Sequence, residues 1–172
     1  VKHARFIFNM GDDPNKKEYW INEDELKLWH DSIKKLAAYY KGKVKYWEIG
    51  NETATAWASK EGEAIPGKEY ARALIAGVEA VKSEDPDAVI VAGGSTASER
   101  SLNPLYEAFT HGAGEYFDLI GFHGYAQAHG LVGQLDILKE RFAKFRCKGR
   151  SFDTETGLCR TRTEESLQLR LA

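Results

Sequence analysis

Short apolar stretches and longer amphipathic stretches alternate along the chain. Apolar stretches rich in β-branched and aromatic residues predict buried strands, and the segments between them carry apolar residues at helical spacing. The predicted strands are Lys2 to Asn9, Val44 to Glu52, Ala88 to Ala92, Phe117 to Tyr125 and Arg150 to Gly157. No tight hairpin signal joins neighbouring strands, so the pattern predicts a parallel sheet with right-handed helical crossovers.

The helices predicted between these strands have recognisable ends. Asn22 followed by Glu25 forms a capping box at the start of the first helix, and Gly42 closes that helix. A shorter helix is framed by Asn103-Pro104 at its start and Gly112 near its end. Apolar residues at helical spacing mark the other two: Tyr70, Leu74, Val78 and Val81 in one, and Leu135, Leu138, Phe142 and Phe145 in the other.

Two architectures fit such an alternation of strands and helices. A doubly wound open sheet that binds a nucleotide needs a glycine-rich phosphate loop, and Gly93-Gly94-Ser95 is too weak a candidate for one. Polar side chains instead stand at the ends of several strands, as they do in a (β/α) barrel. The sequence therefore predicts an α/β fold, a parallel (β/α) barrel of the TIM type that is incomplete, with about five βα units in a single domain over residues 1–172.

Glutamates end two of the predicted strands. Glu52 follows the apolar run YWEIGN, and Glu155 stands before a glycine in RSFDTETG. A solvated loop glutamate is the simpler interpretation of either one alone, but two such strand ends favour a functional pair. Strand alternation also places Glu48 on the side of Glu52, and Asp153 on the side of Glu155, as structural acids lower in the interior.

The fourth predicted strand carries two polar rings at its tip. His123 and Tyr125 share one side of the strand, while Ile120 and Phe122 point to the other. The histidine and the tyrosine can therefore face a barrel mouth while the phenylalanine packs on helices. A satisfied core histidine and a loop-anchoring tyrosine are the structural alternatives.

Composition excludes several classes of protein. The chain has 172 residues, of which 42% are hydrophobic and 29% charged, enough for one sizeable core. With 24 basic against 26 acidic residues there is no electrostatic footprint for nucleic acid or for an anionic membrane surface. No apolar run approaches the ~20 residues that span a bilayer. We expect a soluble protein, either cytoplasmic or secreted with its signal absent from this chain, and the missing initiator Met is consistent with a processed or truncated piece.

The two cysteines are predicted to be free thiols. Cys147 and Cys159 flank the strand that carries Glu155, which separates them by far more than the ~7 Å that a disulfide allows. Neither has a nearby Cys or His set, so a zinc site through them is not expected.

Three motifs together resemble those of a known group of enzymes. WEIGNE, DLIGFHGY and TETG, with SEDPDAVIVAGG between the first two, are similar to clan A retaining glycoside hydrolases of the family 5 and 39 kind. In that clan Asn-Glu ends strand four, His-x-Tyr ends strand six and Glu ends strand seven. The resemblance implies that Glu52 is the acid/base, Glu155 the nucleophile, Asn51 a partner of the sugar 2-hydroxyl, and Tyr125 a support for Glu155. His123 then belongs to the substrate-binding set.

The same resemblance numbers the strands of the barrel. If Lys2 to Asn9 is strand three, the chain holds strands three to seven and lacks strands one, two and eight. A complete barrel needs ~250 residues.

Glycoside hydrolysis explains why two carboxyl groups are needed. One protonates the leaving oxygen and the other attacks the anomeric carbon, at a separation of ~5 to 5.5 Å in retaining enzymes. We expect the pKa of the acid to be raised and Glu155 to stay charged near Tyr125. Trp20 and Trp57, in loops after strands, are candidate stacking platforms for sugar rings, or else aromatics that pack their own loops. No cofactor is expected.

Two other functions remain open. Glu52, His123 and Glu155 could bind a divalent ion in a metal-dependent barrel hydrolase or isomerase. A barrel fragment that has lost its catalysis could act as a sugar-binding or scaffold module. The expected partner is a carbohydrate, with no nucleic acid and no membrane. We also expect a homo-oligomer that covers the open edges at Lys2 to Asn9, apolar on both sides with Lys2 and Arg5 as edge guards, and at the Glu155 strand.

Overall fold

The protein is represented by a computed structural model that describes residues 2–6, 22–52, 67–96, 98–125 and 128–156. Its strands form one parallel sheet in the order β1-β2-β3-β4-β5. The strands are β1 (His3–Phe6), β2 (Tyr46–Asn51), β3 (Val89–Ser95), β4 (Leu119–Gly124) and β5 (Ser151–Thr156). Parallel strands in sequential order confirm the prediction of an incomplete (β/α) barrel.

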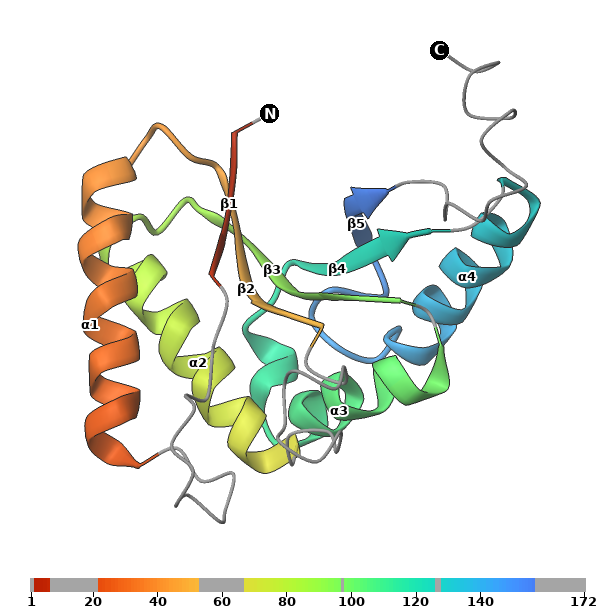
Figure 1. Cartoon of the computed structure of the whole chain (residues 1–172), viewed down its shortest axis with the longest axis horizontal. Helices are drawn as coiled ribbons and strands as arrows, with labels where there is room; N and C mark the ends of the chain where they lie inside the picture. The colour runs from red at the N-terminus through yellow and green to blue at the C-terminus, as the bar shows by residue number, and fades with distance from the viewer. Residues whose placement is uncertain (1, 7–21, 53–66, 97, 126–127, 157–172) are drawn as a thin grey trace, which may run out of the picture.

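Helices follow the strands and cover one side of the sheet, which curls around its other side (Figure 1). They are α1 (Glu23–Tyr40), α2 (Gly67–Glu84), α3 (Glu99–Thr110), the short 3-10 helix η1 (Ala113–Glu115) and α4 (Ala128–Arg141). The predicted capping box is present, since the Asn22 side chain accepts from the Glu25 N–H and the Glu25 carboxylate accepts from the Asn22 N–H. None of the described helices is long and apolar enough to cross a membrane.

Two helix boundaries differ from those predicted. Helix α3 begins well before Pro104, because Ser98 caps it by accepting a hydrogen bond from the backbone N–H of Ser101. Helix α4 ends at Arg141. Phe142 and Phe145 therefore lie in the turns after it, although both still pack in the core.

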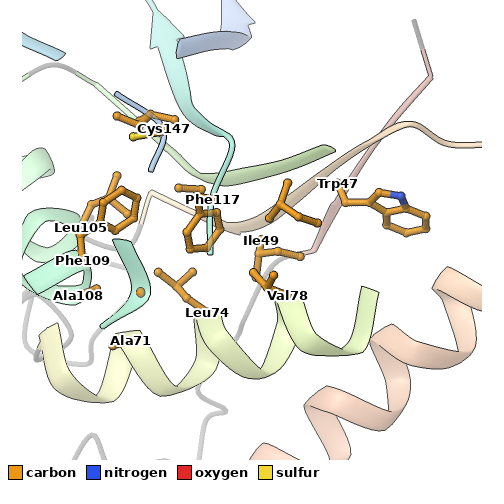
Figure 2. Packing of buried hydrophobic residues seen from close by; sticks show 14 of the residues in the cluster. Trp47, Ile49, Ala71, Leu74, Val78, Leu105, Ala108, Phe109, Phe117 and Cys147 are labelled. Carbon is orange, nitrogen blue, oxygen red and sulfur yellow. The ribbon is translucent and has the colours of Figure 1, made fainter. Parts of the chain in front are cut away.

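The apolar core lies between the sheet and its helices. Ile49 of β2 points toward α2, where Val78 lies beside it and Leu74 lies near Phe117 (Figure 2). Trp47 of β2 stacks on Phe6 of β1 with ring centroids 5.5 Å apart. Further along, Phe117 stacks on Phe109 of α3 with ring centroids 5.5 Å apart. Other buried members of this core are Ile33, Ile90, Ala92, Leu102, Leu105, Ile120, Phe122 and Leu138. Cys147 is a free, buried thiol in the same core, whereas Cys159 lies outside the described residues.

The sequence suggested that the first strand is apolar on both sides, and this is wrong for β1. Ala4 and Phe6 pack against the core, but His3 and Arg5 point to the inner face of the sheet. Arg5 is therefore not an edge guard, because the pleat turns it inward across the curled sheet toward β5. Residues 7–9 of the predicted strand lie outside the described part.

Strands β1 and β5 are the two edges of the described sheet. The homo-oligomer expected from these edges stays a prediction, and light scattering coupled to size exclusion tests it. A monomer near 19.3 kDa at micromolar concentration would contradict it. The single-domain assignment of residues 1–172 also stays a prediction.

Candidate active site

Glu52 directly follows β2 and sits on a strained backbone. Gly50 has φ +91° and Glu52 has φ +41°, a left-handed conformation that non-glycine residues adopt at a cost of about 1 to 3 kcal/mol. The Glu52 N–H donates to the Gly94 carbonyl at 2.8 Å, which ties this bend to β3. The bend therefore lies where the sequence placed a functional carboxylate.

His123 connects Glu52 with the second glutamate. Its Nδ1 lies 2.6 Å from Glu52 Oε1 in hydrogen-bond contact, and 3.7 Å from Glu155 Oε2. The residue is only 1% exposed. A Cβ on Gly94 would stand 2.1 Å from its Nε2, so only glycine leaves room for this ring. Ile120 and Phe122 of the same strand lie in the core, which confirms the predicted division of β4 into two faces.

Glu155 accepts hydrogen bonds from both sides of the inner face. The Tyr125 hydroxyl donates to its Oε2 at 2.5 Å, and the Arg5 guanidinium donates to its Oε1. Partial burial alone would raise the pKa of Glu155, but the bonds from Tyr125 and Arg5 outweigh it and hold the pKa below its usual range. The same bond raises the pKa of Tyr125 to about 12, so the phenol remains a donor across the physiological range.

A bulge in β5 determines which residues face inward. Phe122 pairs with Asp153 but His123 pairs with Glu155, so β5 has one extra residue at this point. The predicted placement of Asp153 in the interior beneath Glu155 is therefore wrong. Asp153 is exposed, and Thr154 turns inward instead.

A second polar layer lies below the glutamate pair. Glu48 is completely buried and accepts hydrogen bonds from Arg5 Nε at 2.6 Å and from the Thr154 hydroxyl at 2.9 Å. His3 Nε2 lies 3.0 Å from the same carboxylate. The interior position of Glu48 was predicted. The roles of Arg5, His3 and Thr154 were missed, although the polar-apolar alternation of HARF in β1 was a signal for the first two.

Most of the residues predicted for the site lie in the described part of the chain. Glu52, His123 and Glu155 each present one donor atom within 4.8 Å of the others, and Tyr125 joins them through Glu155. Asn51 precedes Glu52, and its Oδ1 is buried with no hydrogen-bond partner among the described residues. Trp20 and Trp57, the predicted stacking platforms, lie outside the described residues.

This arrangement is suited to two kinds of chemistry. A carboxylate held charged beside a second carboxyl group supplies the pair that glycosidic bond cleavage requires. A histidine nitrogen and two carboxylate oxygens are also a set that could hold a divalent cation.

No family model matches the chain, and no curated protein matches it. Solved structures do. A GH10 endoxylanase retrieved from a sugarcane soil metagenome aligns with TM-score 0.55 and 19% identity, over 83% of this chain and 44% of its own. Native xylanase 10B from Thermotoga maritima aligns with TM-score 0.53 and 22% identity, over 81% of this chain and 44% of its own.

Xylanase 10B from Thermotoga petrophila RKU-1, in complex with xylobiose, aligns with TM-score 0.51 and 25% identity, over 73% of this chain and 40% of its own. The chain thus spans less than half the length of each of these xylanases. The likeness shows that this chain is folded as part of a TIM barrel like theirs.

Proposed function

We propose that this chain carries the catalytic pair of a retaining glycoside hydrolase that cleaves a poly- or oligosaccharide. Glu155 is the nucleophile and Glu52 the acid/base. The single observation that carries the proposal is the close approach of the two carboxylates, which come from the ends of β2 and β5 and each place an oxygen within 4.8 Å of the other. A separation of ~5 to 5.5 Å is typical of retention, because it leaves no room for a water between the sugar and the second carboxylate.

The partners of Glu155 match its proposed role as the nucleophile. Glu155 is held ionised by Tyr125 and Arg5, as a nucleophile requires. The Glu52 carboxylate is in hydrogen-bond contact with His123 Nδ1. Glu155 attacks the anomeric carbon while Glu52 gives a proton to the leaving oxygen. Glu52 then takes a proton from the water that releases the sugar from Glu155.

The names of the structural neighbours suggest the first substrates to test. All three are xylanases, and one was solved with xylobiose, so a xylan-type chain is the first substrate class in this proposal. The names of these neighbours are GH10 endoxylanase and xylanase 10B, and none of them mentions family 5 or 39. The finer resemblance to families 5 and 39 therefore stays a prediction.

The first experiment is hydrolysis of a panel of aryl glycosides, with xylosides included, followed by substitutions. Glu155→Gln should lower the turnover rate by a factor on the order of 10³ or more. Glu52→Gln should spare activated aryl glycosides more than natural ones, because their leaving groups need little protonation. Glu79→Gln, an exposed carboxylate on α2, is the matched control and should change nothing. NMR of the first product anomer should show retention.

Two outcomes favour other functions. Binding of xylo-oligosaccharides without turnover, undiminished in Glu155→Gln, would indicate a sugar-binding module built on the same barrel. A metal-dependent hydrolase is the second candidate. It is favoured because Glu52, His123 and Glu155 each offer one ligand atom, and these atoms lie within 4.8 Å of one another. Loss of turnover on EDTA treatment, restored by Zn²⁺ or Mn²⁺, would support that candidate and contradict the two-glutamate mechanism.

A further inference from the structure

A buried carboxylate that the proposed reaction does not use lies beneath the site. Glu48 is 0% exposed and stands on β2, between Trp47 and Ile49, which are also completely buried. Its side chain points to the inner face, away from that apolar core. Burying a carboxylate costs several kcal/mol unless it is well paired, so its partners indicate what it does.

Those partners come from the two edge strands. Arg5 of β1 donates from Nε to Glu48 Oε2 at 2.6 Å, and Thr154 of β5 donates its hydroxyl to Oε1 at 2.9 Å. His3 of β1 lies 3.0 Å from Oε2. Glu48 is thus a common partner for β1 and β5, whose side chains meet across the curled sheet.

Arg5 carries this contact upward to the proposed nucleophile. While its Nε binds Glu48, one terminal nitrogen donates to Glu155 Oε1 and the other to the Thr154 carbonyl at 3.3 Å. A guanidinium is a rigid planar fork, so fixing the Nε side fixes the direction of both terminal nitrogens. Glu155 is therefore held by a group that Glu48 orients.

The backbone around Glu48 is shaped to admit the carboxylate. A Cβ on Gly121 would stand 2.5 Å from Glu48 Oε1, and one on Gly94 would stand 2.7 Å from it. Two strands therefore lack a side chain at the positions that face this acid. These two glycines leave the space that the Glu48 carboxylate occupies.

We infer that Glu48 is a positioning residue: it fixes the Arg5 guanidinium and Thr154, and through them the carboxylate of Glu155. The consequence for catalysis rests on the proposed function, but the positional link does not. Without Glu48, the Nε side of Arg5 has lost its anchor and the fork can rotate. Misplacement of a nucleophile by about 1 Å is enough to cost on the order of 100-fold in rate.

The first test needs no substrate. Two-dimensional ¹H–¹⁵N NMR of arginine side chains in the full chain reports the Nε–H of Arg5, assigned by its absence in Arg5→Lys. We expect a protected, downfield-shifted signal in the unmodified protein. In Glu48→Gln it should move upfield and exchange with water about tenfold faster or more, as expected for loss of a charged hydrogen-bond partner.

The matched control is a second buried glutamate paired with an arginine. Glu69 on α2 is 3% exposed and accepts from Arg72 at 2.7 Å, among the helices and away from the inner face. Glu69→Gln should leave the Arg5 signal unchanged. If Glu48→Gln does not fold, Thr154→Val removes one support of Glu48 and should move the same signal in the same direction by a smaller amount. An Arg5 signal that neither variant moves, or that Glu69→Gln moves equally, overturns the inference.

The second test measures catalysis. Glu48→Gln should lower kcat about 10- to 100-fold with KM changed less than about twofold, because the sugar-binding contacts stay in place. Glu69→Gln should leave both values unchanged. An unmodified chain that cleaves no glycoside would refute the proposed function while the NMR result still decides the positional link. A Glu48→Gln variant with normal kcat would refute the role in catalysis.

Discussion

The two faces of the sheet are made from the same strands and have opposite chemistry. Strand β2 shows the contrast within three residues: Trp47 and Ile49 pack into the helix-facing core, while Glu48 between them binds polar groups on the inner face. The outer face is held by apolar packing, which adds up over many contacts and stabilises the fold. The inner face is held by directional bonds that link Glu48, Arg5 and Glu155, so a single misplaced atom affects all of them.

This division separates stability from chemistry. Residues that stabilise the fold point to the helices, and the hydrophobic pattern of the sequence predicts them. Residues of the candidate site point inward from the strand ends. A substitution on one face should therefore change the free energy of unfolding, and one on the other should mainly change the geometry around Glu155.

The largest effect is expected on the outer face. Phe117 is completely buried and stacks on Phe109, so Phe117→Ala should lower the free energy of unfolding by about 3 to 5 kcal/mol through the cavity it leaves. Urea denaturation measures this. Val132→Ala on α4, where the side chain is 62% exposed, should stay within about 0.5 kcal/mol and serves as the control. Similar losses in both variants would show that the outer core does not carry the stability.

A smaller effect is expected where the inner face is crowded. In Gly121→Ala the new methyl would stand 2.6 Å from the Ala92 carbonyl oxygen and 2.9 Å from Gly94 Cα, backbone atoms that cannot turn aside. We expect a loss of about 1 to 3 kcal/mol from this overpacking. The matched variant is Gly133→Ala in α4, which meets nothing within 4 Å and should be stabilised by up to about 1 kcal/mol. A neutral Gly121→Ala would mean that β3 and β4 can separate freely.

Hydrophobic pattern predicted the barrel class because each strand carries a buried face that a local rule detects. The order of strand ends then predicted that Glu52, His123 and Glu155 would approach one another. What the pattern could not give was the bulge in β5, since one extra residue reverses the alternation after Asp153 and only the pairing with β4 reveals it.

The role of Arg5 was missed for a different reason. An arginine in a short edge strand is commonly a solvated guard against aggregation. Here the curl of the sheet brings β1 opposite β5, so that Arg5 reaches Thr154 and Glu155, residues some 150 positions away in sequence. Such a contact depends on how far the sheet bends, which local propensity does not encode.

The smallest effect is expected from removing one hydroxyl on the inner face. Tyr125→Phe deletes a donor that lowers the pKa of Glu155, so that pKa should rise toward its ordinary value. The proposed reaction needs ionised Glu155. On acidification, the turnover rate of Tyr125→Phe should therefore begin to fall at a higher pH than that of the unmodified chain. A carboxyl with a lowered folded pKa contributes stability above its ordinary pKa of about 4.3, and this is lost as pH falls through the folded value.

Tyr125→Phe should therefore lose less stability on acidification than the unmodified chain. The difference is small, because the Glu155 side chain is 31% exposed and solvent screens its pairing. Carbon-13 NMR titration of the glutamate carboxyls measures the pKa directly, with Glu155→Gln to assign the signal. In a Glu155→Gln background the tyrosine substitution should have no effect on acid stability. A Glu155 pKa that stays low in Tyr125→Phe would leave Arg5 as the main source of the lowering, and the inner face would then depend on the guanidinium more than on the phenol.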